Sequence, residues 1–346
     1  MVQHSLPDRL GATAPPPVTF VCATGCAPAR PPDVRDLRAP NLFITVDMAS
    51  PDLSARARGA LLGHAAGNAL GVPTEFIGTP EGIRAKFPDG VKDVLRQDTP
   101  DSPYDDDLAL TLILGEELLE EDIDLRRLAH RWADWAERDG RGIGLWTLKA
   151  LRHIRTHDAP PSSTGGQAGN GAVSRCLPLA LRAAGSPANL VSGTYHTAML
   201  THPDERCGWG AVAVNFAAAC FLQGRRDFIG EVLEVLRNNA APDELMQAVR
   251  RVPLEKKEEL PVSGPSAGYV VHAVEIGLWF AYHEPNLERG LIWLANAGGD
   301  TDTNAAVAGG LMGARDGERA VPARWLEAIP DVSRIRHLAD RLVGAA

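Results

Sequence analysis

Carboxylate and hydroxyl side chains alternate in one short segment near the end of the chain. Asp300 and Asp302 stand two residues apart, Thr303 follows them, and Gly298 and Gly299 precede them. Carboxylate and hydroxyl oxygens are hard ligands that suit Mg²⁺, Mn²⁺ or Ca²⁺, whereas thiols and imidazoles prefer softer metals. This C-terminal acidic segment therefore offers three oxygen ligands for a divalent cation from a single turn.

A second acidic segment lies far upstream. Three consecutive aspartates follow Tyr104, and an apolar stretch begins after them: Asp105, Asp106 and Asp107. Two pairs of carboxylates can complete one cation site or bridge two ions, which lie about 3.5–4 Å apart in two-metal enzymes. We therefore expect the upstream and C-terminal acidic segments to meet in space around hard metal ions.

Helix capping also explains either acidic segment alone, because an aspartate in a first turn satisfies free N–H groups and the helix dipole. Capping does not require paired carboxylates at both places, so the two segments together favour a metal site. A calcium-binding EF-hand is excluded. Asp300, Asp302 and Asn304 match its first three ligands. However, Ala305 replaces the required glycine and Leu311 replaces the glutamate.

Three further features are candidates for binding or catalysis. Glu75 follows an apolar helix, where a carboxylate can orient or deprotonate water, although an exposed glutamate needs no function. His202 precedes a long apolar segment and fits ligand contact and a helix-entry role equally well. The segment 169–172 opens a predicted helix whose free N–H groups can hold a phosphate, but a plain turn is the simpler explanation.

Composition limits the class of protein and the kind of partner. The 346 residues are 45% hydrophobic and 23% charged, which is ordinary for a soluble globular protein. The formal net charge of −9 argues against nucleic acid as the main partner. Five widely spread cysteines without a CxxC pair argue against structural zinc and a disulfide scaffold. We therefore expect a cytoplasmic protein with neither a secretory signal nor a membrane span.

Periodicity predicts an all-α protein. Residues 1–50 are proline-rich and poor in periodic apolar positions, so we expect a disordered extension followed by one domain over residues 51–346. Residues 160–171 are predicted to form an irregular loop and residues 256–259 a solvated linker. The predicted helices cover residues 53–70, 108–120, 125–138, 145–156, 172–184, 189–200, 206–223, 227–238, 242–252, 269–282, 286–296, 303–315 and 322–328, with a last helix after Asp331.

Small residues recur at a spacing of four in two of these helices. In the first helix they are Gly59, Gly63, Gly67 and Gly71. Each interior glycine costs roughly 1 kcal/mol relative to alanine, and together they leave a smooth groove on one face. The helix after the C-terminal acidic segment carries a matching stripe at Ala305, Gly309 and Gly313. We therefore expect these two helices to pack closely and to bring Glu75 near that segment.

Over roughly residues 54–317 the chain resembles the ADP-ribosylglycohydrolases. This family includes the dinitrogenase-reductase-activating glycohydrolase and the ADP-ribosylarginine and ADP-ribosylserine hydrolases. The blocks that carry the resemblance stand in the family's order. They are residues 58–71 with Glu75 and Phe76 (opening helix), residues 104–107 (first metal motif), residues 169–172 (ribose and phosphate loop), Thr201 with His202 (histidine block) and residues 295–303 (second metal motif).

The resemblance implies a single large orthogonal all-α domain with two Mg²⁺ or Mn²⁺ ions in a cleft. It also implies hydrolysis of the glycosidic bond of an ADP-ribosyl group on a protein side chain or small molecule, with Glu75 as a catalytic carboxylate. The expected metal ligands are Tyr104, Asp105, Asp106, Asp300, Asp302 and Thr303. The expected substrate-binding residues are Asn68, Asp107, Gly169, Asn170, Gly171, Ala172, His202, Gly298 and Gly299.

The chain departs from the family pattern at three positions. The family has Asp in place of Asn68 and Thr in place of both Tyr104 and Asp107. The missing threonine removes one oxygen ligand, for which the phenol or a backbone oxygen of Tyr104 can substitute, and Asp107 adds a carboxylate. Beside an active monomeric hydrolase, two alternatives therefore stand: a non-catalytic ADP-ribose-binding relative, and a metallohydrolase of another nucleotide or glycoside.

Overall fold

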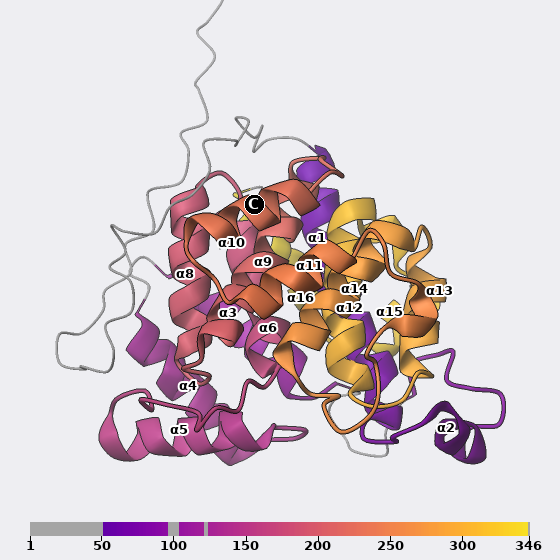
Figure 1. Cartoon of the computed structure of the whole chain (residues 1–346), viewed down its shortest axis with the longest axis horizontal. Coiled ribbons are helices and arrows are strands. Elements are labelled where there is room, and N and C mark those ends of the chain that lie inside the picture. Colours follow the sequence, from indigo (N-terminus) through magenta and orange to yellow (C-terminus); the bar gives the residue numbers. More distant parts are fainter. Residues whose placement is uncertain (1–50, 96–103, 121–123, 345–346) are drawn as a thin grey trace, which may run out of the picture.

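The protein is a bundle of α-helices without a β-sheet in the part of the chain that the structure describes (Figure 1). The computed structural model describes residues 51–95, 104–120 and 124–344, which contain sixteen α-helices. In these ranges the β-type pairing is limited to one isolated bridge between Gly169 and Tyr269. The predicted all-α class is therefore confirmed, whereas the expected extension at residues 1–50 lies outside the described residues.

The sixteen helices of the described residues follow one another along the chain. Their bounds are α1 Pro51–Gly71, α2 Pro80–Lys86, α3 Asp106–Glu117, α4 Leu125–Arg138, α5 Leu145–His157, α6 Gly171–Arg175, α7 Leu177–Arg182, α8 Pro187–Met199, α9 Glu205–Leu222, α10 Ile229–Asn238, α11 Asp243–Arg251, α12 Val270–His283, α13 Leu287–Ala295, α14 Thr301–Asp316, α15 Ala323–Ala328 and α16 Val332–Leu342. Three 3₁₀ turns interrupt them: η1 Val72–Thr74, η2 Lys257–Glu259 and η3 Glu318–Ala320.

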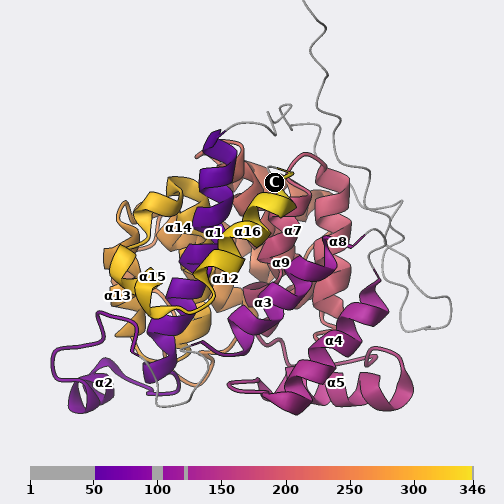
Figure 2. The same ribbon diagram turned by 180° about the vertical axis from the view of Figure 1, so that it is seen from behind.

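Helices α1 and α14 pack with their backbones in contact, as the stripes of small residues predicted (Figures 1 and 2). A Cβ added at Gly63 would lie 2.2 Å from the carbonyl oxygen of Gly309, and one at Gly67 would lie 2.0 Å from that of Ala305. These distances leave no room for a side chain. The contact explains why α1 tolerates glycines in its interior, and it places the end of α1 against the start of α14.

Helices α9, α12 and α14 complete the centre of the bundle and contact one another. Every residue of α9 from Cys207 to Leu222 is buried, which explains why this helix is apolar on all sides. Cys176, Cys207 and Cys220 are buried free thiols. The long buried helices therefore form a rigid frame around the start of α14.

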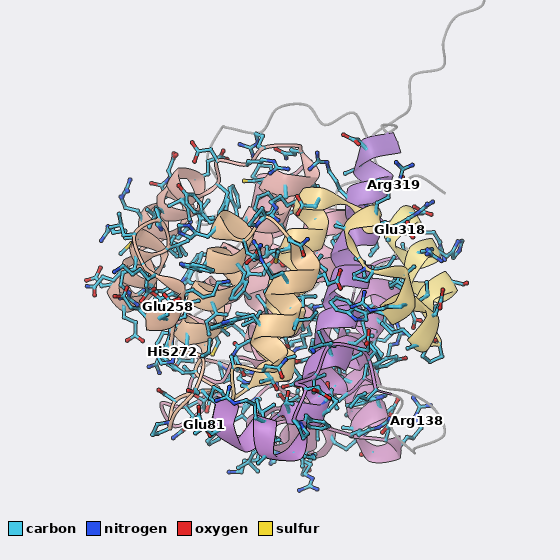
Figure 3. The ribbon with its side chains drawn as sticks, turned by 90° about the vertical axis from the view of Figure 1, so that its right-hand side faces the viewer. Glu81, Arg138, Glu258, His272, Glu318 and Arg319 are labelled. Carbon is cyan, nitrogen blue, oxygen red and sulfur yellow. The ribbon has the colours of Figure 1, made fainter. Side chains whose placement is uncertain are left out.

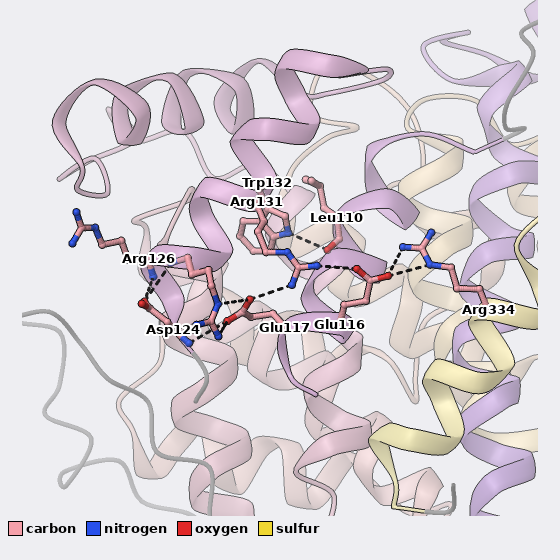
Figure 4. Close-up of polar contacts among 9 residues, drawn as sticks. Leu110, Glu116, Glu117, Asp124, Arg126, Arg131, Trp132 and Arg334 are labelled. Atoms are coloured by element: carbon pink, nitrogen blue, oxygen red, sulfur yellow. Dashed lines mark hydrogen bonds and ion pairs between the residues drawn. The ribbon is translucent and has the colours of Figure 1, made fainter. Parts of the chain in front are cut away.

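Ion pairs join the outer helices to this frame. Glu116 of α3 accepts hydrogen bonds from Arg131 of α4 and Arg334 of α16 (Figure 4). At the other end of the molecule, Arg58 of α1 lies 3.9 Å from Glu318, which Figure 3 shows beside the start of α1. Such partly exposed pairs contribute little stability individually, so they mainly specify how the outer helices dock.

The predicted helix over residues 172–184 is wrong in one respect, because the structure divides it into α6 and α7 at Cys176. Pro178 lies in the first turn of α7, where its missing N–H costs nothing. Helix α2 was not predicted, and the segment expected to be a solvated linker forms η2, whose Lys257 contacts Glu284. Among the described helices, none combines the length and hydropathy needed to cross a bilayer.

Candidate active site

The C-terminal acidic segment lies at the start of α14. Gly298 and Gly299 adopt φ values of +85° and +78°, a left-handed conformation that glycine tolerates best. They turn the chain so that Asp300 occupies the N-cap position of α14. Asp302 and Thr303 then lie in its first turn, and all three of these polar side chains are buried. Their burial sets them apart from ordinary capping residues, which face solvent.

The upstream acidic segment lies at the start of α3. Asp105 occupies the N-cap position and accepts a long hydrogen bond, 3.4 Å, from the backbone amide of Asp107. Its Oδ1 also accepts a 2.7 Å hydrogen bond from the side-chain amide of Asn68 on α1. Asp105, Asp106 and Asp107 are all buried, so α1 and α3 together hold this carboxylate group inside the bundle.

The two acidic segments meet in space, as the sequence predicted. Carboxylate oxygens of Glu75, Asp105 and Asp302 all lie within 4.8 Å of one another. The close packing of α1 on α14 causes this convergence, because a Cβ added at Gly71 would lie 2.4 Å from the backbone of Asp302. Glu75 follows η1 directly after α1 and is half-buried. We call the group formed by Glu75 and the two acidic segments the acidic centre.

Hydrogen bonds inside the protein leave several oxygens of the acidic centre unused. The Asp300 side chain makes no capping hydrogen bond to α14, although its Oδ2 accepts a 2.8 Å hydrogen bond from the side-chain amide of Asn170. At and beside the acidic centre, the buried oxygens without a hydrogen-bond partner among the described residues are Asp105 Oδ2, Asp107 Oδ2, Asp300 Oδ1, Asp302 Oδ1 and Asn304 Oδ1. Buried polar atoms are normally paired. Capping therefore does not account for the acidic centre, whereas an oxygen-seeking cation fits its donor set.

Burial and mutual repulsion raise the pKa values of these carboxyl groups. Burial is the larger cause for Glu75, whose pKa rises to about 9, and neighbouring Asp105 and Asp300 add to it. Burial, and then Asp105, raise the pKa of Asp107 to about 7. For Asp302, burial and then Asp105 push the pKa well above its usual range. Without a bound cation, the acidic centre therefore takes up protons that the unfolded chain would release.

The segment 169–172 joins the acidic centre to the histidine block. The side-chain amide of Asn170 donates to Asp300, and the backbone amide of Asn170 donates 3.1 Å to the carbonyl of Gly268. A Cβ added at Gly169 would lie 3.1 Å from Nε2 of His202. His202 is fully buried, and burial lowers its pKa to about 3, so its imidazole is neutral at pH 7. These predicted substrate-binding residues therefore border one side of the acidic centre.

Comparison with known proteins agrees with this arrangement. The family model of the ADP-ribosylglycohydrolases matches residues 49–346. The chain belongs to the ADP-ribosylglycohydrolase family. Proteins of this family are hydrolases that act on glycosyl bonds, so the chain is an enzyme of that class.

Two relatives and one solved structure show how far the similarity extends. The ADP-ribosyl-(dinitrogen reductase) glycohydrolase of Rhodospirillum rubrum is 32% identical over 313 residues, which cover 86% of this chain and 99% of that protein. An ADP-ribosylarginine hydrolase of Serratia proteamaculans is 28% identical over 306 residues, which cover 83% of this chain and 78% of that protein. A solved structure described as an ADP-ribosylglycohydrolase-related protein complex has a TM-score of 0.71 and 27% sequence identity. The match covers 86% of this chain and 99% of the chain in that structure.

Two of the three departures from the ADP-ribosylglycohydrolase pattern have a structural explanation. Asn68 donates to Asp105, a bond that an aspartate cannot make when ionised. The phenol of Tyr104 donates to Asp331 in the turn before α16, so its oxygen is engaged outside the acidic centre. The backbone oxygen of Tyr104 remains the atom through which we expect this residue to bind a cation.

Two further residues at the ADP-ribosylglycohydrolase site lie outside the predicted set. The sequence offers Asn304 only as an EF-hand position, yet its Oδ1 is buried beside the aspartates without a partner among the described residues. Arg175 is fully buried and donates a 2.6 Å hydrogen bond to the carbonyl of Gly171. It also donates to the hydroxyl of Thr201, which contacts His202. An arginine within an apolar helix is the signal that would have found it.

A cavity of about 450 Å³ lies next to the acidic centre. Tyr104 and Asp105 form the part of its lining that belongs to the first metal motif. Glu116, Arg131 and Arg334 also line it and pair with one another, as Figure 4 shows. Because Arg131 and Arg334 both pair with Glu116, these three charged groups are already engaged within the protein. The cavity therefore provides space beside Asp105.

Proposed function

We propose that this protein hydrolyses the glycosidic bond that joins an ADP-ribosyl group to a protein side chain or a small molecule, with the help of Mg²⁺ or Mn²⁺. The observation that carries the proposal is the convergence of Glu75, Asp105 and Asp302, whose carboxylate oxygens lie within 4.8 Å of one another. These residues come from three separate parts of the chain, and no structural need of the bundle explains their grouping.

The donor set of the acidic centre fits a hard divalent cation. Five buried oxygens without partners among the described residues, on Asp105, Asp107, Asp300, Asp302 and Asn304, are available to it. Carboxylate, amide and hydroxyl oxygens are the ligands that Mg²⁺ and Mn²⁺ accept. We propose as ligands Asp105, Asp106, Asp300, Asp302, Thr303 and an oxygen of Tyr104. When bound, two such cations supply positive charge that holds ribose hydroxyls and polarises water.

The surrounding side chains have separate tasks in this proposal. Asn170 and neutral His202 bind the ribose and phosphate part of the substrate, because they border the acidic centre and carry hydrogen-bonding groups. Glu75 orients water at its carboxylate and accepts its proton. The remaining negative charge favours an oxocarbenium-like transition state at the anomeric carbon. Burial of all these groups except Glu75 keeps bulk water away from the reacting bond.

Conjugates on proteins are the first substrates to test. The Rhodospirillum rubrum relative is named for ADP-ribosyl-(dinitrogen reductase), and the Serratia proteamaculans relative for ADP-ribosylarginine. The first name describes an ADP-ribosyl group on a protein, and the second describes one on arginine, which is a protein side chain. We therefore propose that the acceptor of this enzyme is a protein side chain, with a small-molecule acceptor as the next candidate.

The test is release of ADP-ribose from ADP-ribosylated peptides, measured with Mg²⁺, with Mn²⁺ and with EDTA. We expect release with either cation and none with EDTA. Glu75→Gln should abolish release, whereas Glu81→Gln, a control in the exposed helix α2, should leave it unchanged. Tight ADP-ribose binding without release in any condition would support the non-catalytic alternative. Release from other nucleotides or glycosides alone would support the other metallohydrolase.

A further inference from the structure

Phe76 has an unusual backbone conformation for a bulky residue. Its φ is +59°, in the left-handed region, where the Cβ of an L-residue crowds the following carbonyl oxygen. Only two other non-glycine residues in the described ranges share a positive φ, Asp158 and Ala240. An aspartate or alanine carries a smaller side chain than phenylalanine, so Phe76 is the most strained of the three.

Backbone pairing on both sides holds Phe76 in this conformation. Its amide donates a 3.0 Å hydrogen bond to the carbonyl of Gly299, and the amide of Gly299 donates 3.1 Å to the carbonyl of Ile77. Gly299 directly precedes Asp300 of the acidic centre. The strained residue is therefore locked to the segment that positions the aspartates, and it cannot relax without moving that segment.

Packing does not compensate for this strain. The Phe76 side chain is 78% exposed, and only Leu254, at 83%, is more exposed among the large hydrophobic residues described. Leu254 is absent from the residues with positive φ and lies far along the chain, between α11 and η2. An exposed aromatic ring on a strained backbone stabilises nothing in the fold, and such outliers are concentrated at functional sites.

The position of Phe76 decides which part of a substrate its ring can reach. Phe76 follows Glu75, whose carboxylate belongs to the acidic centre, and consecutive Cα atoms are about 3.8 Å apart. In an ADP-ribosyl conjugate the leaving group is bonded directly to the anomeric carbon. Adenine is separated from that carbon by the distal ribose, two phosphates and a second ribose. A side chain next to Glu75 is therefore within range of the leaving group and far from the base.

We propose that Phe76 is a specificity-determining residue whose ring stacks on the guanidinium of an ADP-ribosylarginine acceptor. The proposal depends on the proposed function and refines its substrate class. The face of a phenylalanine ring carries partial negative charge and attracts planar cations. A guanidinium is planar and cationic, whereas the neutral O-glycosidic linkage of a serine conjugate offers neither property. The ring is expected to favour the arginine linkage over the serine linkage.

The experiment compares two peptides of one length, one carrying ADP-ribosylarginine and one ADP-ribosylserine. The variants are Phe76→Gly and Phe76→Asn, which tolerate positive φ without a ring, and Phe76→Tyr, which keeps the ring. Leu254→Ala removes an equally exposed apolar side chain elsewhere and is the control. We expect Phe76→Gly and Phe76→Asn to lower kcat/KM for the arginine peptide about tenfold, mainly through KM. Phe76→Tyr and Leu254→Ala should match the wild type.

Phe76→Gly and Phe76→Asn should retain or raise the Tm of the protein, because they relieve backbone strain and lose no buried contact. For the serine peptide, kcat/KM should change less than for the arginine peptide. Equal kcat/KM of wild type and Phe76→Gly on the arginine peptide would overturn the inference, as would an equal loss on both peptides or a marked drop in Tm. Failure of the wild type to release ADP-ribose from either peptide would overturn the proposed protein side-chain acceptor and this inference together.

Discussion

The side-chain amide of Asn68 donates a 2.7 Å hydrogen bond to Oδ1 of Asp105. In return, Oδ1 of Asn68 accepts a 3.2 Å hydrogen bond from the backbone amide of Asp105. This reciprocal pair ties α1 to the start of α3. It uses one donor and one acceptor of the asparagine side chain. The pair holds Asp105 toward Glu75 and Asp302 even when no cation is bound.

Asn68→Asp should destabilise the cation-free protein and increase its affinity for Mn²⁺. An ionised carboxylate at this position would lose the donor to Asp105 and add a buried negative charge, at a cost of about 1–3 kcal/mol. The same added carboxylate gives a bound cation a further oxygen ligand. Thermal unfolding in EDTA and calorimetric titration with Mn²⁺ measure the two effects. An unchanged Tm in EDTA would show that the Asn68–Asp105 pair contributes nothing.

Gly63→Ala should disrupt the contact between α1 and α14. The added Cβ would lie 2.2 Å from the carbonyl oxygen of Gly309, so the helices must separate. Overpacking of this kind costs about 1–3 kcal/mol, and Mn²⁺ affinity should fall because the separation moves the start of α14. Chemical denaturation measures the free energy of unfolding. Gly78→Ala is the control, because no atom lies within 4 Å of its added Cβ, and a similar loss there would contradict the packing explanation.

Removal of divalent cations should make stability fall as pH rises. The folded pKa of Glu75 is about 9 and that of Asp107 about 7, both above the ordinary values of 4.5 and 3.8. Protons bound to these two carboxyl groups stabilise the folded state, and this stabilisation is complete at a pH below the ordinary pKa values. It is lost as pH rises through the folded pKa values, at up to about 1.4 kcal/mol per pH unit per group. Unfolding in EDTA between pH 5 and 9 should show this decline. A saturating concentration of Mn²⁺ should flatten it, and a flat profile in EDTA would refute the prediction.

Asp302→Asn should abolish turnover without unfolding the protein. Removing one of several repelling carboxylates stabilises the cation-free form, so its Tm in EDTA at pH 8 should equal or exceed that of the wild type. The gain in Tm on adding Mn²⁺ should shrink, because one ligand is lost. If Asp302→Asn instead lowers Tm strongly in EDTA, Asp302 serves the helix start and not a cation.

Arg175→Met should weaken ADP-ribose binding more than it lowers stability. The guanidinium of Arg175 bonds Gly171 and Thr201 and lies 4.7 Å from the ring centre of Trp132, so it aligns the segment 169–172 with the histidine block. Methionine keeps the length and the packing but loses the hydrogen bonds. We expect Kd for ADP-ribose to rise about tenfold, equivalent to about 1.4 kcal/mol.

Calorimetry on Arg175→Met, Arg175→Lys and the wild type would measure this effect. Lysine keeps the charge but lacks the planar guanidinium fork whose two nitrogens reach Gly171 and Thr201, so it should restore binding only in part. Arg182→Met is the control, since Arg182 bonds a single carbonyl, that of Leu118, away from the acidic centre. Equal affinities for Arg175→Met and Arg182→Met would contradict a positioning role.

Local sequence determined the helices and the chemistry of the acidic centre. Helix α4 begins and ends where periodicity predicted, because Asp124 caps it and its apolar positions repeat at helical spacing. The short helix α6 was missed because its end at Cys176 depends on packing and on Pro178 in the next helix, not on a strong breaker inside it. Ligand type was readable because carboxylates, hydroxyls and amides have fixed chemistry wherever they lie.

Tertiary structure alone decided how these groups meet. The sequence predicted that α1 packs on α14 and that the two acidic segments meet. Only the fold shows which carboxylate oxygens come together, namely those of Glu75, Asp105 and Asp302, within 4.8 Å of one another. It also shows that the phenol of Tyr104 bonds Asp331, that Arg175 lies buried behind the segment 169–172, and that Phe76 is strained and exposed. Side-chain type and helical spacing are local properties, whereas burial, partners and backbone strain depend on which segments the tertiary structure brings into contact.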